Sequence, residues 1–219
     1  MSELSKRAAK YYFVQGIKQF LFVIGFIAMM IVFNCLLFDQ GSETEVFMDG
    51  VGMALFTGRL MVIALNFMFS VYGPNWYDSM ALSLGCRRKD IFIGEMIKQA
   101  VFVLCNMILL ISLATVTKQR HSWILVVSGI FAFVVGPLGL VVGHKVKKIG
   151  MMVIVILMLV TAFLGQCVVN MIGPKLDVFL AEGHSCIGLV IGFIIVAAVL
   201  FTIFEYWAYK LNKNSMVCV

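Results

Sequence analysis

Residues 77–99 of this chain read YDSMALSLGCRRKDIFIGEMIKQ and lie between two long apolar segments. The stretch combines a short run with helical spacing of apolar residues, a glycine and three consecutive cations. Around it the chain is largely apolar, because 62% of its 219 residues are hydrophobic and only 13% are charged. Soluble domains carry about 25% charged residues. The composition therefore predicts an integral membrane protein, with residues 77–99 connecting two of its membrane spans.

Apolar segments long enough to cross a bilayer, which takes about 20 residues in a helix, recur along the whole chain. They are too long for barrel strands, and backbone groups in lipid must bond within their own segment, so each is expected to be a helix. The predicted fold is an all-α integral membrane protein, with one transmembrane domain over residues 1–219. The six predicted spans are Phe20–Phe38, Gly50–Tyr72, Ile91–Ala114, Ser122–Val142, Gly150–Ile172 and Ser185–Tyr209.

The basic residues indicate how the spans are oriented, because cytoplasmic loops of membrane proteins carry an excess of Lys and Arg. If the spans alternate in direction, most of the 17 Lys and Arg residues fall on one side. Both termini are therefore expected in the cytoplasm and the protein in the cell membrane. Contact with anionic lipid accounts for the net charge of +6, so nucleic acid is not an expected partner. The cations on the inner side are Lys6, Arg7, Lys10, Lys18, Arg87, Arg88, Lys89, Lys98, Lys145, Lys147, Lys148, Lys210 and Lys213.

Motifs for catalysis or cofactor binding do not occur in the sequence. It contains neither a G-x-x-x-x-G-K-[ST] phosphate loop nor an H-E-x-x-H motif. His121, His144 and His184 lie at span ends or in loops on different connections, which argues against a shared metal site. The six cysteines form no disulfide framework. We therefore expect no enzyme activity, no metal and no cofactor on this chain.

Residues 74–90 are expected to form a short cytoplasmic helix between the second and third spans. Pro74 should end the second span, and Asn75 should cap a new helix. Gly85 suits the left-handed position that closes a helix. A helix of two to three turns is too short to be stable alone, so it should rest on lipid or on a partner protein. Its apolar face comprises Tyr77, Met80, Ala81 and Leu84.

Three cations at the start of the third span need an explanation, because the helix dipole disfavours positive charge there. Arg87, Arg88 and Lys89 can serve topology and attract lipid phosphates, as in any cytoplasmic loop. They can equally belong to a docking surface for another protein. The residues alone leave both explanations open. Glu95, near the cytoplasmic end of the same span, can pair with Lys98, and its side chain is expected to reach toward water.

The order of parts resembles the membrane subunit of an ABC transporter of the type-2 exporter class. A basic, aromatic segment over residues 1–19 precedes the first span, and LSLGCRRKDIFIGEMI is similar to the turn that opens the third span in such permeases. The resemblance implies an N-terminal interfacial helix, a coupling helix in residues 74–90, a separate cytoplasmic ATP-binding subunit, and a second copy of the permease or a related one. It also implies that the ATP-binding subunit is met by Tyr77, Asp78, Met80, Leu84, Arg87 and Arg88.

Arg59, in the outer half of the second span, is a further candidate, because intramembrane cations often have functional roles. Its side chain can equally reach the outer interface. The small-residue pairs Gly139–Gly143 and Gly188–Gly192 permit close approach of helices. The alternative to an exporter subunit is a stand-alone membrane protein, either a secondary carrier or a protein associated with a sensor. A carrier commonly shows internal repeats, and no clear three-plus-three repeat is visible.

Overall fold

The computed structural model describes residues 3–37, 43–83, 85–117, 123–145 and 187–214, with isolated helical residues between Val153 and Cys167. In these ranges the chain is helical apart from short turns, and no strand occurs, so the all-α prediction is confirmed for them. The elements are α1 (Glu3–Leu37), α2 (Glu43–Tyr72), η1 (Gly73–Tyr77), α3 (Asp78–Ser83), α4 (Arg88–Val116), α5 (Trp123–Lys145) and α7 (Ile187–Asn214).

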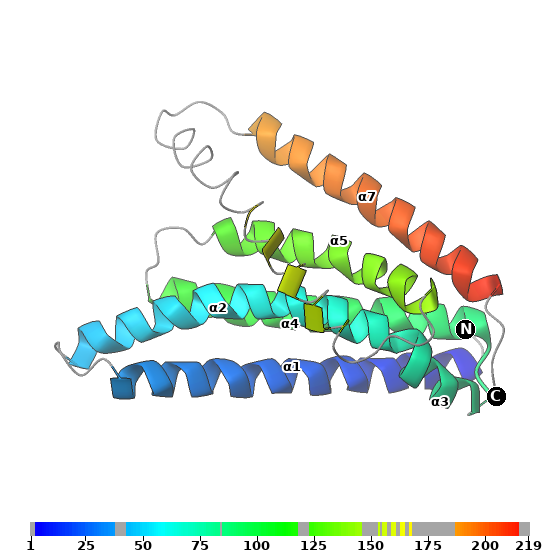
Figure 1. Ribbon diagram of the computed structural model, residues 1–219, viewed down its shortest axis with the longest axis horizontal. Coiled ribbons are helices and arrows are strands. Elements are labelled where there is room, and N and C mark those ends of the chain that lie inside the picture. The colour runs from blue at the N-terminus through cyan, green and yellow to red at the C-terminus, as the bar shows by residue number, and fades with distance from the viewer. Residues whose placement is uncertain are drawn as a thin grey trace.

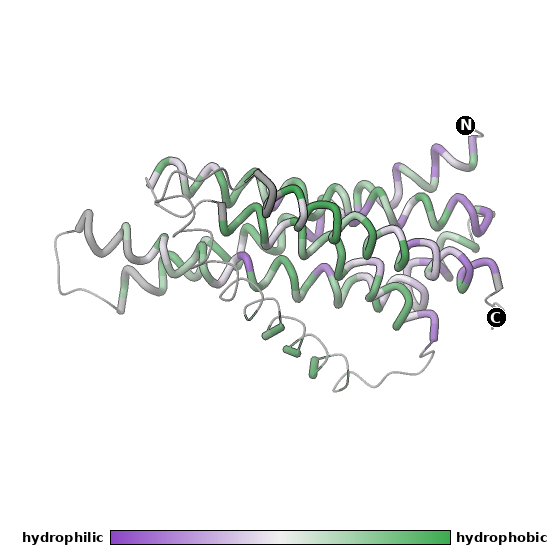
Figure 2. The backbone as a smooth tube through the Cα atoms, turned by 90° about the horizontal axis from the view of Figure 1, so that it is seen from above, coloured by the Kyte–Doolittle hydropathy of each residue, from purple (hydrophilic) through white to green (hydrophobic). Residues whose placement is uncertain are grey.

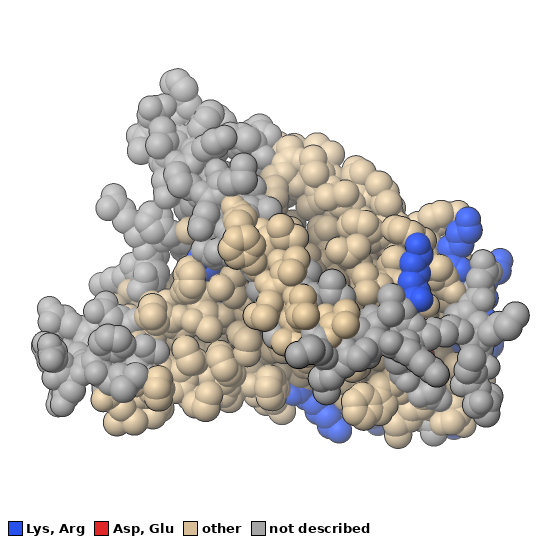
Figure 3. All heavy atoms as spheres, in the orientation of Figure 1, with Lys and Arg blue, Asp and Glu red and all other residues tan. Residues whose placement is uncertain are grey.

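The long helices α1, α2, α4 and α5 run side by side along the molecule, and α7 leans across α5 (Figure 1). Short α3, the Glu3 end of α1 and the Asn214 end of α7 all lie at one end of this bundle (Figure 1). We call it the terminal end. Hydrophilic residues gather there (Figure 2), as do most of the Lys and Arg side chains visible in Figure 3.

Several of these helices are long and apolar enough to cross a membrane, as expected for a multi-pass membrane protein. The predicted span Gly150–Ile172 falls largely outside the described residues. The five candidate spans in the described part are Glu3–Phe33, Gly50–Tyr72, Arg88–Val116, Ile124–Lys145 and Ile191–Lys213.

Two helices, α2 and α5, lie at the centre and pack closely. The approach depends on small residues of α5, because a Cβ atom added at Gly139 would lie 2.7 Å from the carbonyl oxygen of Phe67. At Gly143 it would overlap the carbonyl oxygen of Val71. This pair of glycines therefore serves packing within the chain. Gly192 of α7, by contrast, has no neighbouring atom within 4 Å of such a Cβ.

The N-terminal segment differs from the separate interfacial helix expected over residues 1–19. Helix α1 runs without a break from Glu3 to Leu37 and includes the first span. Two contacts with α4 hold it against the bundle: Tyr12 is fully buried on Gly94, and Gly16 approaches the carbonyl oxygen of Lys98. Neither proline nor a helix-breaking cluster interrupts the segment, so it continues as one helix.

The junction after the second span also differs from prediction. Pro74 does not end the helix, and Asn75 does not cap a new one; the chain passes through the π-helical turn η1 directly into α3. Asp78 N–H donates to the carbonyl oxygen of Gly73, a bond five residues back. A wider turn accommodates proline, which has no N–H to donate, and such turns are frequent at functional sites.

Candidate functional site

A tight turn connects α3 to α4 at the terminal end. Gly85 has a φ of +80°, as its expected closing role requires. Its N–H donates to the carbonyl oxygen of Leu82 at 2.9 Å, and the N–H of Cys86 donates to that of Ala81 at 3.2 Å. These two bonds form a Schellman motif, which satisfies carbonyls at the end of a helix. The turn thus fixes the angle between α3 and α4.

Apolar contacts attach this turn to α1. Ala81 and Cys86 are buried in one small cluster with Ala8, Tyr12 and Ile91. The cluster draws on α1, α3, the turn and the start of α4. A six-residue helix is not stable alone. These contacts within the chain supply support that was expected from lipid or from a partner protein.

The residues predicted to meet an ATP-binding subunit occupy different environments. Met80 is 56% exposed and Arg87 is also exposed, whereas Tyr77 and Arg88 are half-buried. Asp78 faces inward and is 7% exposed, so its carboxylate is not available at the surface. Leu84 lies outside the described residues.

Trp76 is an exposed residue that sequence reasoning missed. It is 71% exposed on η1, with its ring 6.2 Å from that of Tyr72. Its position four residues before Met80 was the available signal, because residues i and i+4 share a helix face. Three exposed side chains of this connection, Trp76, Met80 and Arg87, are called the docking face.

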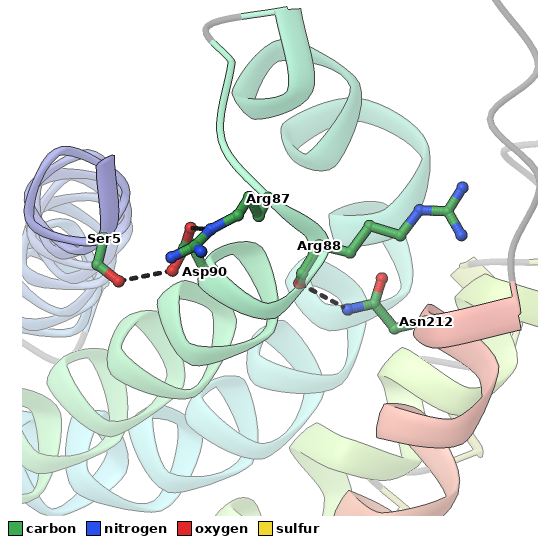
Figure 4. Close-up of polar contacts among 5 residues, drawn as sticks. All are labelled: Ser5, Arg87, Arg88, Asp90 and Asn212. Atoms are coloured by element: carbon green, nitrogen blue, oxygen red, sulfur yellow. Dashed lines mark hydrogen bonds and ion pairs between the residues drawn. The ribbon is translucent and has the colours of Figure 1, made fainter. Parts of the chain in front are cut away.

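Arg87 makes an ion pair within the chain. It is the residue before α4 begins, and its Nε lies 3.0 Å from Oδ2 of Asp90 (Figure 4). The other carboxylate oxygen of Asp90 accepts a bond of 2.5 Å from the hydroxyl of Ser5 on α1 (Figure 4). Asp90 therefore links the start of α4 to the start of α1, at a helix N-terminus where negative charge is favoured.

Arg88 connects the same turn to α7. Its guanidinium donates to the carbonyl oxygen of Lys213 at 3.0 Å. The Asn212 amide donates to the carbonyl oxygen of Arg88 at 3.0 Å (Figure 4). A cation near the last carbonyls of a helix is favourable. This bond gives Arg88 a role in holding α7 to the turn. Neither explanation offered from the sequence, lipid attraction or docking, included that role.

Inside the terminal end lies a group of ionisable side chains from three elements. We call Tyr12, Asp78, Glu95 and Lys98 the buried charge cluster. Lys98 Nζ lies 2.5 Å from Glu95 Oε2, and the Tyr12 hydroxyl donates to Asp78 Oδ1 at 2.7 Å. The possible Glu95–Lys98 pair forms, but the expectation that Glu95 reaches water is wrong, since Glu95 is 2% and Lys98 1% exposed.

Neighbouring groups complete the surroundings of the cluster. Lys98 Nζ lies 4.7 Å from the ring centroid of Tyr77 and donates to the carbonyl oxygen of Phe69 at 3.4 Å. Gly73 leaves room for the Glu95 carboxylate, because a Cβ there would lie 2.8 Å from Oε1. Tyr77, predicted to face a partner, thus covers Lys98 instead.

The electrostatics of Asp78 follow from this enclosure. Burial raises the pKa of its carboxyl to about 8, and the nearby Glu95 carboxylate acts in the same direction. The hydrogen bond from Tyr12 and the charge of Lys98 act in the opposite direction but do not cancel the effect of burial.

Polar residues continue from the cluster along one face of α4. Gln99 and Asn106 are buried on this face. On α2, the Asn66 amide donates to the carbonyl oxygen of Ala132 at 2.8 Å. Gly136 of α5 leaves room for the amides, since a Cβ there would lie 2.6 Å from Gln99 Oε1. Sequence reasoning missed this face. The helical spacing of Glu95, Lys98, Gln99 and Asn106 was a signal for it.

Arg59 is enclosed within the bundle, away from the terminal end. Arg59 is 9% exposed, and its guanidinium lies 4.7 Å from the ring centroid of Phe56. A guanidinium over an aromatic face is a favourable arrangement when desolvated. This burial places Arg59 among buried intramembrane cations, while its functional role stays a prediction.

In the described ranges, no group of three or more His, Cys, Asp or Glu side chains is arranged to hold a metal ion. In the same ranges Cys86 and Cys105 are free thiols. No family model, curated protein or solved structure matches this chain.

Proposed function

We propose that this chain is the transmembrane subunit of an ATP-driven exporter of the type-2 ABC class. A separate cytoplasmic ATP-binding chain would dock on it, and a second permease would complete the translocation path. The observation that carries the proposal is the docking face. It presents an exposed Trp, Met and Arg on a short element between two spans. Trp and Arg are enriched among residues that dominate binding energy at interfaces.

The anchoring of this element supports a coupling role. Asp78 and the turn before α4 bind α1 through Tyr12 and the small apolar cluster. Arg88 binds the end of α7. A partner that moved α3 would therefore act on several spans together, because packed elements transmit displacement rather than absorb it.

The positions of α5 and α7 support six spans. Helix α5 ends near the terminal end, whereas α7 begins at the opposite end (Figure 1). The connection 146–186 must therefore reach from one end to the other, and it contains the apolar segment Gly150–Ile172. With Lys and Arg gathered at the terminal end, that end is assigned to the cytoplasm.

The orientation predicts a labelling pattern in intact cells. In a variant without native cysteines, a cysteine at position 43, in place of Glu43, should react with a membrane-impermeant maleimide. A cysteine in place of Ser215 should react only after the cells are permeabilised, because the terminal end faces the cytoplasm. Labelling of position 215 but not 43 in intact cells would reverse the assigned orientation.

The docking face predicts loss of the ATP-binding partner. Trp76→Ala combined with Met80→Asp should leave the amount of inserted protein unchanged, because both side chains are exposed. ATP hydrolysis that copurifies with the affinity-purified chain should fall about tenfold or more, since truncated interface anchors commonly cost over ~1 kcal/mol each.

Trp207→Ala is the matched control. It removes an exposed tryptophan from α7, where the ring lies 4.6 Å from Lys145 Nζ, and should leave the copurified activity unchanged. Equal hydrolysis by wild type and the Trp76–Met80 variant would argue against docking at this face. Absence of any ATP-binding chain from wild-type membranes would argue against the exporter.

A stand-alone secondary carrier is the second candidate, and the buried charge cluster favours it. Buried ionisable residues in membrane helices commonly mark ion or proton pathways. A carrier would transport its substrate in vesicles that contain this chain alone, driven by an imposed pH gradient. An exporter subunit would need ATP and its partner.

A further inference from the structure

The buried charge cluster has more acidic than basic groups. When all are ionised, Asp78 and Glu95 contribute two negative charges and Lys98 one positive charge. All three side chains are almost fully enclosed, at 7%, 2% and 1% exposed. An uncompensated charge in such an environment is costly, and buried groups usually avoid it by changing protonation state.

Hydrogen bonds do not offset the excess charge. The oxygens of Glu95 make no hydrogen bond in the described part of the chain, besides their ion pair with Lys98. Asp78 accepts a bond on one oxygen, from the Tyr12 hydroxyl. Carboxylates that stay ionised when buried commonly accept two or three hydrogen bonds. One further positive charge would neutralise the cluster.

We propose that the buried charge cluster binds one proton, shared between the carboxyl groups of Asp78 and Glu95, and that this proton keeps α3 docked on α1. The site lies between three elements: Tyr12 from α1, Asp78 at the start of α3, and Glu95 with Lys98 from α4. A bound proton needs no cavity, and both carboxyls and the Tyr12 hydroxyl can exchange one. The site would exist in an exporter subunit and in a carrier alike.

The other groups around the cluster are consistent with one bound proton. From α7, Glu205 lies within electrostatic range of Glu95 and is itself buried; it lies outside the cluster, and a negative charge there would favour the bound proton. Helix α5 approaches the neighbouring turn through Gly143, which lies beside Pro74. The Tyr77 ring covers Lys98.

The sign of the linkage follows from Asp78. Its folded-state pKa, about 8, lies above the ordinary value of 3.8, so the folded protein holds the proton more tightly than the unfolded chain. The penalty for burying Asp78 is absent below about pH 4 and complete above about pH 8. Raising the pH through this window should therefore loosen α3 from α1.

Infrared spectroscopy of the purified full-length chain tests the proton directly, because a protonated carboxyl has a carbonyl stretch separate from carboxylate bands. The spectrum is recorded in lipid from about pH 5 to about pH 10. Wild type should show this band at neutral pH and lose it with a midpoint near pH 8. Absence of any such band above about pH 6 would overturn the proposal.

Two substitutions test whether the proton is shared. Asp78→Asn leaves Glu95 with Lys98, and Glu95→Gln leaves Asp78 with Lys98, so either change removes the excess negative charge. Each should therefore abolish the band that titrates near pH 8. Glu205→Gln is the control and should retain it. A titrating band that survives either cluster substitution, or that only Glu205→Gln removes, would overturn the assignment.

Tyr12→Phe keeps the test informative if those variants fail to fold. It retains the ring on Gly94 but removes the bond that favours ionised Asp78. Proton affinity should rise about tenfold, which moves the midpoint up by about one pH unit. An unchanged midpoint would contradict the proposed site.

Hydrogen exchange tests the link to α3. Protection factors for the backbone amides of residues 78–86, corrected for the intrinsic rate at each pH, should fall in wild type as the pH rises from about 5 to about 8 and should level off above the midpoint. In Asp78→Asn they should not depend on pH. Protection in wild type that stays constant between about pH 5 and about pH 8 would show that the proton does not control docking of α3.

Discussion

Replacing Lys98 with methionine should lower the free energy of unfolding by about 3–5 kcal/mol, the cost of removing one partner of a buried ion pair. Methionine keeps the length and apolar stem of the side chain, so packing against the Tyr12 and Tyr77 rings is largely retained. The Glu95 carboxylate loses its partner at 2.5 Å. It must then stay buried and ionised or take up a proton, and both carry a free-energy cost.

Unfolding of the detergent-solubilised chain by a denaturing detergent, followed by circular dichroism, measures this change. Lys89→Met is the matched control, because Lys89 lies on the same helix but is exposed, and it should stay within about 0.5 kcal/mol of wild type. Adding Glu95→Gln to Lys98→Met should restore most of the loss. Equal stability of the two lysine variants would contradict burial of the pair.

Gly143→Ala should lower the free energy of unfolding by about 1–3 kcal/mol, the usual cost of overpacking a tight interior. The new methyl group would meet the carbonyl oxygen of Val71, a backbone atom of α2. It would also lie 3.1 Å from Pro74 Cδ, in a ring that cannot rotate away. Helix α5 must therefore move away from α2, which opens the centre of the bundle.

Gly192→Ala separates this packing effect from helix propensity. Alanine stabilises a helix interior by about 1 kcal/mol relative to glycine, and Gly192 has open space around it. The same unfolding measurement should find this variant as stable as wild type or slightly more stable. If Gly143→Ala behaved in the same way, α5 would not approach α2 as closely as described.

Local patterns predicted the turn at Gly85 correctly but not the junction at Pro74. A left-handed glycine closes a helix through bonds to carbonyls only a few residues away, so the sequence around it is sufficient. Proline ends a helix only if the backbone hydrogen-bond pattern cannot widen around it. Here η1 widens and the chain continues into α3, where Asp78 and Ala81 are held by α1.

The environment of charged residues could not be predicted from their positions along the chain. Glu95 and Lys98 lie near a span end, where long side chains commonly reach water. Their burial depends on Tyr12, which is 83 residues before Glu95, and on Tyr77, neither of which is adjacent in sequence. Arg88 likewise found its partner in the end of α7, far away in sequence.

Segment length and apolarity by themselves determined that this chain is helical and built to lie in a membrane, because a backbone in lipid must satisfy its own hydrogen bonds. Only the tertiary structure decided which polar side chains face inward. Asp78, Glu95 and Lys98 became one site when α1 packed across α3 and α4 and excluded water from all three. Exposure to solvent is a property of the assembled bundle, since each helix alone leaves these groups accessible.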